Sequence, residues 1–191
     1  KMEKKTKFYQ ASTSELYGNS GKKSQNEDTP FNPESPYATA KLYSYWITKN
    51  YRNAYGIFAS NGILFNHEGP TRGETFVTRK ITMGISEILA KKKKKLFLGN
   101  LDAKRDWGHA KDFVEGIWKI IQFHKADDFV LSTGQTYSVR NFVELAFSII
   151  GIKIRWVGNG LKEKGINIEN KQTLIEIDKK YYRPNEVDYL R

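Results

Sequence analysis

Alternation of short apolar runs with longer helical patterns is the feature that most restricts the fold of this chain. The apolar runs have the length of strands and lie at 8–12, 58–65, 96–98, 129–132 and 152–157. The helical patterns lie between them at 36–55, from 76, at 110–124 and at 138–150. Strands that alternate with helices predict an α/β fold with a parallel sheet. The C-terminal segment RPNEVDYLR resembles the first turns of a further helix.

The composition excludes several kinds of site. The 191 residues include no cysteine, which excludes disulfides, zinc–thiolate sites and cysteine nucleophiles. The three histidines, His67, His109 and His124, have no metal-ligand spacing, so no metal site is expected. No apolar run approaches the roughly 20 residues of a membrane-spanning helix. The first ten residues lack the apolar stretch of a signal peptide, so a soluble cytoplasmic protein is expected.

The chain is basic, with 32 Lys and Arg against 21 Asp and Glu and a net charge of +11. Clustered basic residues can bind nucleic acid by neutralising its phosphates. Five of the lysines, however, form the single run Lys91 to Lys95 between an amphipathic segment, 76–90, and a short apolar one, 96–98, which favours a solvated loop. A noncatalytic polyanion-binding protein remains one alternative, and a salt series of DNA binding with this run neutralised would test it.

Two polar motifs are candidates for catalysis, one at the start of a predicted helix and one just after a predicted strand. Tyr37 and Lys41 form a YxxxK pattern, whose i, i+4 spacing places both side chains on one helix face. An ammonium beside a phenol favours the phenolate, so such a pair can exchange protons with a hydroxyl or carbonyl. Thr13 and Glu15 directly follow the first predicted strand, where open α/β sheets place active-site loops. Alone, each motif could be an ordinary helix face or polar turn.

Five longer runs together resemble a known family. They are FYQASTSELYG, SPYATAKLYSYWITKNYR, NGILFNHEGPTRGETFVTRKIT, LFLGNLDAKRDWGHAKDFV and YYRPNEVDYL. These runs cover nearly the whole chain and resemble the GDP-mannose 4,6-dehydratase family of extended short-chain dehydrogenases/reductases. The resemblance implies a lyase that converts GDP-mannose to GDP-4-keto-6-deoxymannose, a step towards GDP-fucose and related deoxysugars, with tightly held NADP. Another NAD(P)-dependent sugar-nucleotide epimerase or reductase is the narrower alternative.

The resemblance also implies roles for the two motifs. Tyr37 would remove the proton of the sugar 4-hydroxyl while hydride passes to the nicotinamide, and Lys41 would hold the nicotinamide ribose. The ketone formed at C4 acidifies the C5 hydrogen, which Glu15 would remove as water leaves from C6. Hydride then returns to C6, and Thr13 would hydrogen-bond the C4 oxygen. A transient oxidation thus serves a reaction with no net redox change.

Further positions match family contacts. His67 and Arg72 match cofactor-binding positions, within a run in which Gly69 and Thr71 depart from the family pattern. The substrate-binding positions, which would meet the GDP-sugar, are Asn66, Lys80, Asn100, Arg105, Arg183 and Glu186. Arginine suits a diphosphate through its planar fork of donors, and lysine suits it through its compact charge. Each of these residues could instead be a surface group.

The resemblance implies two domains. Residues 1–66 would form the C-terminal part of a Rossmann-like NAD(P)-binding fold. Residues 67–191 would form mainly a smaller α/β GDP-sugar-binding domain, with segments near 110–132 returning to the first sheet. The glycine fingerprint that binds a dinucleotide is not in the sequence, so we expect a segment truncated at both ends that is inactive alone and does not bind NADP tightly.

The helix predicted at 36–55 has more apolar side chains than one buried stripe needs. They are Tyr37, Leu42, Tyr43, Tyr45, Trp46, Ile47, Tyr51 and Tyr55. In the family that the chain resembles, the equivalent helix packs against its copy in a second subunit. We therefore expect a homodimer or homotetramer through this helix, weakened by Trp46→Glu or Tyr45→Glu. The alternative is that the tyrosines only expose their hydroxyls at the surface.

Overall fold

The computed structural model describes residues 5–20, 24–182 and 189–190, which belong to two compact units. Unit 1 takes its residues from Lys1–Gly69, Arg105–Thr136 and Val187–Arg191. Unit 2 takes its residues from Pro70–Lys104 and Tyr137–Glu186. The chain therefore passes from one unit to the other more than once, and each unit is described by itself.

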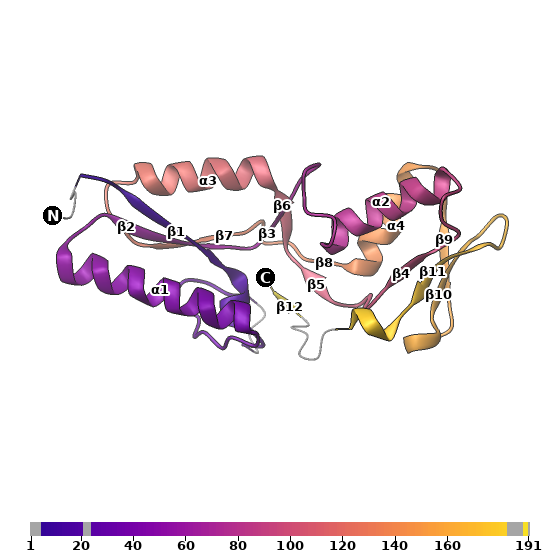
Figure 1. Ribbon diagram of the computed structural model, residues 1–191, viewed down its shortest axis with the longest axis horizontal. Helices are drawn as coiled ribbons and strands as arrows, with labels where there is room; N and C mark the ends of the chain where they lie inside the picture. Colours follow the sequence, from indigo (N-terminus) through magenta and orange to yellow (C-terminus); the bar gives the residue numbers. More distant parts are fainter. Residues whose placement is uncertain (1–4, 21–23, 183–188, 191) are drawn as a thin grey trace. The chain divides into compact units, whose positions relative to one another are not determined.

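Unit 1 is built on a three-stranded parallel sheet with the order β1-β2-β7. The strands are β1 (Phe8–Thr13), β2 (Ala59–Leu64) and β7 (Asp128–Leu131). Helix α1 (Pro36–Tyr55) covers one face of this sheet, and α3 (Ala110–Gln122) covers the other (Figure 1). All six residues of the central strand β2 are buried, as expected for a strand between two helical layers.

Helix α1 has the limits that its sequence predicts. The Ser35 hydroxyl accepts a hydrogen bond from the Ala38 N–H at 3.1 Å, and Pro36 occupies the first turn. Gly56 ends the helix with a left-handed conformation, φ 62°, that a residue with a side chain rarely adopts. The predicted helix over 36–55 is confirmed.

Short elements complete unit 1 at the carboxyl end of its sheet. The 3₁₀ turn η1 (Ser14–Tyr17) follows β1, and β3 (Asn66–Glu68) follows β2 and pairs in parallel with β6 (Trp107–His109). The buried core beneath them comprises Leu16, Tyr17, Tyr45, Ile63, Leu64, Phe65 and Phe113. Residues of η1 and of the segment after β2 thus pack into one core with α1.

Unit 2 has a four-stranded mixed sheet with the order β4-β11-β10-β9. Its strands are β4 (Leu96–Leu98), β11 (Thr173–Ile177), β10 (Lys164–Asn167) and β9 (Ile154–Val157). Only β4 and β11 are parallel. Helices α2 (Val77–Leu89) and α4 (Val139–Ile149) pack against each other beside this sheet (Figure 1). The remaining short elements are β5 (Lys104–Arg105), β8 (Tyr137–Ser138), η2 (Gly160–Lys162) and η3 (Lys179–Tyr181).

The expected parallel α/β pattern is correct for unit 1 and incomplete for unit 2. The sequence analysis did not predict β10 and β11, two short strands that pair antiparallel to each other. The strand expected at 152–157 begins at Ile154, because the Ile152 N–H bonds to the Phe147 carbonyl and extends the cap of α4. The helix expected at the C-terminus is wrong for the described residues there, since Tyr189–Leu190 is the strand β12.

Within the described part of the chain, no helix combines the length and apolarity needed to cross a membrane. The same residues hold no group of three or more His, Cys, Asp or Glu side chains suited to a metal ion.

Candidate active site

Thr13 and Glu15 lie at the carboxyl end of β1, on the turn that the strand enters. Thr13 keeps an extended backbone and caps η1, with its Oγ1 accepting the Glu15 N–H at 3.2 Å. The hydroxyl hydrogen of Thr13 can still be donated to another acceptor. Glu15 is half-buried in the first turn of η1. The strand end thus offers a hydroxyl donor and a carboxylate two residues apart.

The first turns of α1 bring Tyr37 and Lys41 to the same end of β1. The Lys41 Nζ donates to the carbonyl oxygen of Ala11, a β1 residue, at 2.9 Å. The same nitrogen lies 5.8 Å from the centre of the Tyr37 ring, as the i, i+4 spacing predicts. Tyr37 is 53% exposed, so its phenol is accessible to a ligand. A phenol and an ammonium therefore lie beside the strand that ends in Thr13.

The loop between these two motifs is fixed at its base. The Asn32 N–H donates to the Leu16 carbonyl at 2.8 Å, which ties the approach to α1 to the turn η1. Gly18 follows that turn with φ 51°, and a side chain there would overlap the Asn32 carbonyl oxygen. Tyr17 is fully buried and its hydroxyl donates to the Asn26 carbonyl at 2.8 Å. The turn that carries Glu15 thus also anchors the segment leading to Tyr37.

Asn66 and His67 lie on β3, just beyond the carboxyl end of the neighbouring strand β2. The register Thr13↔Leu64 places the ends of β1 and β2 side by side. The His67 Nδ1 lies 3.0 Å from the Phe65 carbonyl oxygen, and its ring stacks on Phe113 at 5.0 Å. A carbonyl only accepts, so Nδ1 carries the hydrogen and Nε2 can meet a further group.

The remaining predicted binding residues are divided between the units. Arg72, predicted to bind the cofactor, belongs to unit 2 with the predicted substrate-binding residues Lys80 and Asn100, and Arg105 belongs to unit 1 with the two motifs. Arg183 and Glu186 lie outside the described residues. The Asn100 Oδ1 accepts the Asp102 N–H at 2.9 Å, which is a local turn contact.

Lys80 has the most perturbed environment of the predicted substrate-binding residues. Its Nζ lies 3.2 Å from the centre of the Tyr181 ring. Burial, followed by the nearby Lys180 ammonium, lowers the pKa of Lys80 to about 8. Arg72 packs its guanidinium over the Phe76 ring at 3.7 Å. Both cations in unit 2 therefore lie against aromatic rings.

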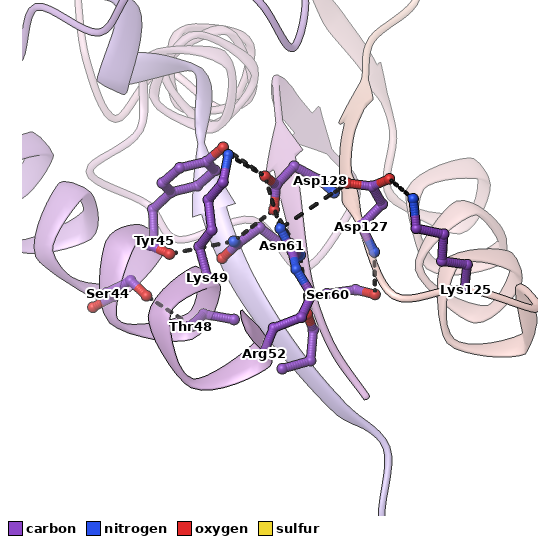
Figure 2. Close-up of polar contacts among 11 residues, drawn as sticks. Ser44, Tyr45, Thr48, Lys49, Arg52, Ser60, Asn61, Lys125, Asp127 and Asp128 are labelled. Atoms are coloured by element: carbon purple, nitrogen blue, oxygen red, sulfur yellow. Dashed lines mark hydrogen bonds and ion pairs between the residues drawn. The ribbon is translucent and has the colours of Figure 1, made fainter. Parts of the chain in front are cut away.

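Two buried carboxylates in unit 1 were not predicted as site residues. Asp106 is fully buried and accepts hydrogen bonds from the Thr133 N–H and hydroxyl and from the Gly134 N–H. Asp128 is buried at the start of β7 and binds side chains of α1 (Figure 2). Asp106 lies inside the motif RDWGHAKD, whereas no local pattern marks Asp128.

The chain is similar in sequence to known proteins. A family model described as GDP-mannose 4,6 dehydratase matches residues 1–191. The GDP-mannose 4,6-dehydratase of Sinorhizobium fredii (strain HH103) is 58% identical over 186 residues, covering 97% of this chain and 53% of that protein. The human GDP-mannose 4,6 dehydratase is 55% identical over 185 residues, covering 97% of this chain and 50% of that protein. The chain spans about half the length of these relatives.

Solved structures share the fold at lower identity. The dTDP-glucose 4,6-dehydratase of Bacillus anthracis, solved with NAD, has a TM-score of 0.72 at 23% identity and covers 90% of this chain and 49% of that one. RMD from Pseudomonas aeruginosa, solved with NADPH, has a TM-score of 0.76 at 20% identity and covers 90% of this chain and 54% of that one.

Proposed function

The chain belongs to the GDP-mannose 4,6-dehydratase family, and from this premise we propose that the complete protein converts GDP-mannose to GDP-4-keto-6-deoxymannose. The observation that carries the proposal is the position of the Tyr37–Lys41 pair. Lys41 bonds to the backbone of the strand whose end supplies Thr13 and Glu15. A proton acceptor for a sugar hydroxyl and a second base for a carbon-bound proton are thus carried by neighbouring elements of one unit.

We propose NADP as the cofactor, and the donor set of unit 1 suits a nicotinamide ribose. The Lys41 ammonium has three N–H donors, of which its bond to Ala11 uses one. The remaining donors can meet ribose hydroxyls, and His67 Nε2 is the nitrogen free of the Phe65 contact. When bound, the nicotinamide would take hydride from C4 and return it to C6. Arg72 is proposed as a further cofactor contact.

The residues of unit 1 divide the proton transfers between them. Tyr37 would take the proton of the sugar 4-hydroxyl, with Lys41 stabilising the phenolate. Thr13 would donate its hydroxyl hydrogen to the C4 oxygen, a bond that strengthens as that oxygen gains charge. Glu15 would remove the C5 proton, which the neighbouring ketone acidifies, and water would leave from C6. The reaction needs two bases with different targets, which explains why the site combines the Tyr37 phenol with the Glu15 carboxylate.

The GDP-sugar is proposed to meet residues that offer donors to phosphate and ribose. Lys80 and Arg105 would bind the diphosphate by charge, and Asn66 and Asn100 would hydrogen-bond the sugar nucleotide. Arg183 and Glu186 are carried over from the family motif alone. The bound dianion would stabilise the Lys80 ammonium, which burial disfavours in the free chain.

We also propose a homodimer or homotetramer through α1. The exposed side chains on its outer face are Tyr43, Trp46, Ile47, Tyr51 and Tyr55. Such a contiguous apolar face is typical of an interface between subunits. Trp46→Glu should weaken assembly in sedimentation at micromolar concentration. Tyr45 is not part of this face, because it is only 3% exposed and bonds to Asp128. The sequence-based expectation that Tyr45→Glu weakens assembly is therefore wrong, and we expect this change to impair folding instead.

The direct test of the proposed activity uses Glu15→Gln in the complete protein with GDP-mannose and NADP. Removing the base while keeping the shape should lower formation of the keto-deoxy product by roughly 10²–10⁴-fold. Glu115→Gln, a change of an exposed carboxylate on α3, should leave the rate unchanged. Near-normal turnover of the Glu15 variant, or a wild-type product other than GDP-4-keto-6-deoxymannose, would refute the assignment.

A further inference from the structure

Asp128 joins α1 to the sheet of unit 1 through several hydrogen bonds. The Arg52 guanidinium donates to both carboxylate oxygens of Asp128, at 2.9 and 3.1 Å. The Tyr45 hydroxyl donates to Oδ2 at 2.8 Å, and the Asn61 Nδ2 donates to Oδ1 at 2.9 Å (Figure 2). The Lys49 ammonium lies 3.4 Å from Oδ2. Three of these four partners belong to α1, and Asn61 belongs to β2.

The contacts to Asp128 are directional because they are hydrogen bonds, and burial strengthens them. The Asp128 side chain is only 7% exposed, and the Arg52 side chain is only 11% exposed. Burial opposes ionisation of Asp128, but hydrogen bonds from Arg52, Asn61 and Tyr45 outweigh it and lower its pKa. Burial, followed by the bond to Asp128, raises the pKa of the Tyr45 phenol, so this hydroxyl remains a donor. The Asp128 carboxylate therefore stays ionised, and the Tyr45 hydroxyl stays protonated.

The same stripe of α1 carries the Asp128 partners and the proposed catalytic pair. At about 100° per residue, Lys41 lies roughly 40° around the helix from Tyr37. By the same spacing, Arg52 lies at about 60° and Tyr45 at about 80°. Tyr43, on the exposed side of the helix, lies at about 240° on the same scale. Any rotation that changes the Asp128 contacts therefore also turns Tyr37 and Lys41.

The helix has one anchor near each end. Near its start, Lys41 bonds to the Ala11 carbonyl of β1. Near its end, Arg52 bonds to Asp128 on β7, the strand at the opposite edge of the sheet, and Tyr45, midway along the helix, bonds to the same carboxylate. Tyr37 and Arg52 are 15 residues apart, about 22 Å along the axis. Two anchors on different strands fix both the tilt and the rotation of a rod of this length.

Small rotations of α1 matter for proton transfer. A turn of about 20° moves an atom that lies roughly 6 Å from the axis by about 2 Å. A displacement of about 1 Å at reacting groups can lower a rate by about 10²-fold. Lys41 alone cannot define the rotation, because its four-carbon stem is flexible. The planar fork of Arg52 is the more rigid reference.

We propose that Asp128, with Arg52 and Tyr45, is a positioning site that sets the rotation of α1 and thereby the aim of Tyr37 and Lys41. The proposal rests on the proposed function for the roles of Tyr37 and Lys41. It assigns Asp128 no contact with substrate or cofactor. It differs from a purely stabilising role because it predicts an effect at the far end of the helix.

The test compares Arg52→Lys and Tyr45→Phe with Ser44→Ala in the complete protein. Arg52→Lys keeps the charge but loses the fork, and Tyr45→Phe removes one hydroxyl. Ser44→Ala also removes one hydroxyl from α1, but that hydroxyl donates to the Ala40 carbonyl of the same helix at 3.1 Å. The readouts are kcat and KM for GDP-mannose, and amide hydrogen exchange of residues 37–44 measured by mass spectrometry.

We expect both anchor variants to lower kcat about tenfold or more with KM within about twofold, as expected when positioning for reaction is lost. Exchange of residues 37–44 should quicken at least about fivefold, and the Ser44 variant should match the wild type. Faster exchange confined to residues 45–55, with kcat within about twofold of the wild type, would overturn the proposal. A wild-type protein without dehydratase activity would refute the proposed function instead. In that case, unchanged exchange of residues 37–44 in the anchor variants would overturn the proposed positioning role of Asp128.

Discussion

The two units hold their charged side chains in different ways. In unit 1 the Arg52–Asp128 pair is almost fully removed from solvent and joins a helix to a strand. In unit 2 the pairs Lys95–Glu176 and Arg140–Asp102 connect elements near the surface, with Asp102 77% exposed. Desolvation makes loss of one partner costly in the first case and nearly neutral in the second. A desolvated pair therefore helps to fix the geometry of unit 1, whereas the exposed Asp102 and the partly exposed Lys95–Glu176 pair contribute little to unit 2.

The largest expected effect in this comparison comes from Asp128→Ala. The change leaves the Arg52 guanidinium buried without its partner, and we expect the free energy of unfolding to fall by about 3–5 kcal/mol. Asp102→Ala, which removes an exposed partner of Arg140, should cost at most about 1 kcal/mol. Denaturant unfolding of the complete protein measures both. Equal losses in the two variants would remove the contrast between the units.

Gly62→Ala tests how tightly the sheet of unit 1 is packed. A Cβ at Gly62 would overlap the Tyr9 hydroxyl, whose ring crosses the strand at that point. We expect a loss of about 1–3 kcal/mol in the free energy of unfolding. Gly69→Ala is the matched control, because its Cβ would meet only the Ala110 Cβ at 3.8 Å. Thermal unfolding should show a lower Tm for the first variant and little change for the second.

The pH dependence of GDP binding tests whether Lys80 of unit 2 contacts the diphosphate. With a pKa of about 8, its charged fraction falls roughly tenfold between pH 7 and pH 9. Because the diphosphate needs the ammonium, the Kd for GDP should rise by up to about tenfold over that range. Lys80→Arg, which stays charged, should remove this rise. Calorimetric titration at both pH values measures it, and a flat wild-type Kd would contradict a phosphate contact.

Glu176→Gln is expected to have the smallest effect. Hydrogen bonding to Lys95, at 2.6 Å, lowers the pKa of Glu176 below its usual value. A lowered pKa in the folded state adds stability above the pKa of the unfolded chain, and this stability is lost as the pH falls. The pair is partly exposed, so the change should cost at most about 1 kcal/mol at pH 7. Unfolding midpoints between pH 7 and pH 3 should depend less on pH in the variant.

Local sequence signals predicted much of unit 1. Ser35, Pro36 and Gly56 define the ends of α1 because capping depends on adjacent residues. The strand pattern predicted the position of Thr13 at the end of β1 and of Glu15 just beyond it. The i, i+4 spacing alone predicted that Lys41 lies beside Tyr37.

Contacts between distant segments were not predictable from such signals. Tyr45 and Asp128 are 83 residues apart, and nothing near either residue indicates the pairing. Tyr45 therefore looked like part of the exposed aromatic face in the sequence, although it is buried. Strand β10, KGIN, is short and has little strand propensity, and β11 pairs with β4 from a distant part of the chain. The apolar residues of β11, TLIEI, were a local strand signal that the sequence analysis missed.

The central claim is that Tyr37, Lys41, Thr13 and Glu15 belong to the active site of a GDP-mannose 4,6-dehydratase. The most direct measurement gives the complete protein GDP-mannose carrying deuterium at C4, with NADP, and locates the label in the product by NMR. The account predicts that the deuterium moves to C6 and that Tyr37→Phe stops this transfer. A keto-deoxy product without deuterium at C6, or a Tyr37 variant that transfers the label at the normal rate, would contradict this assignment.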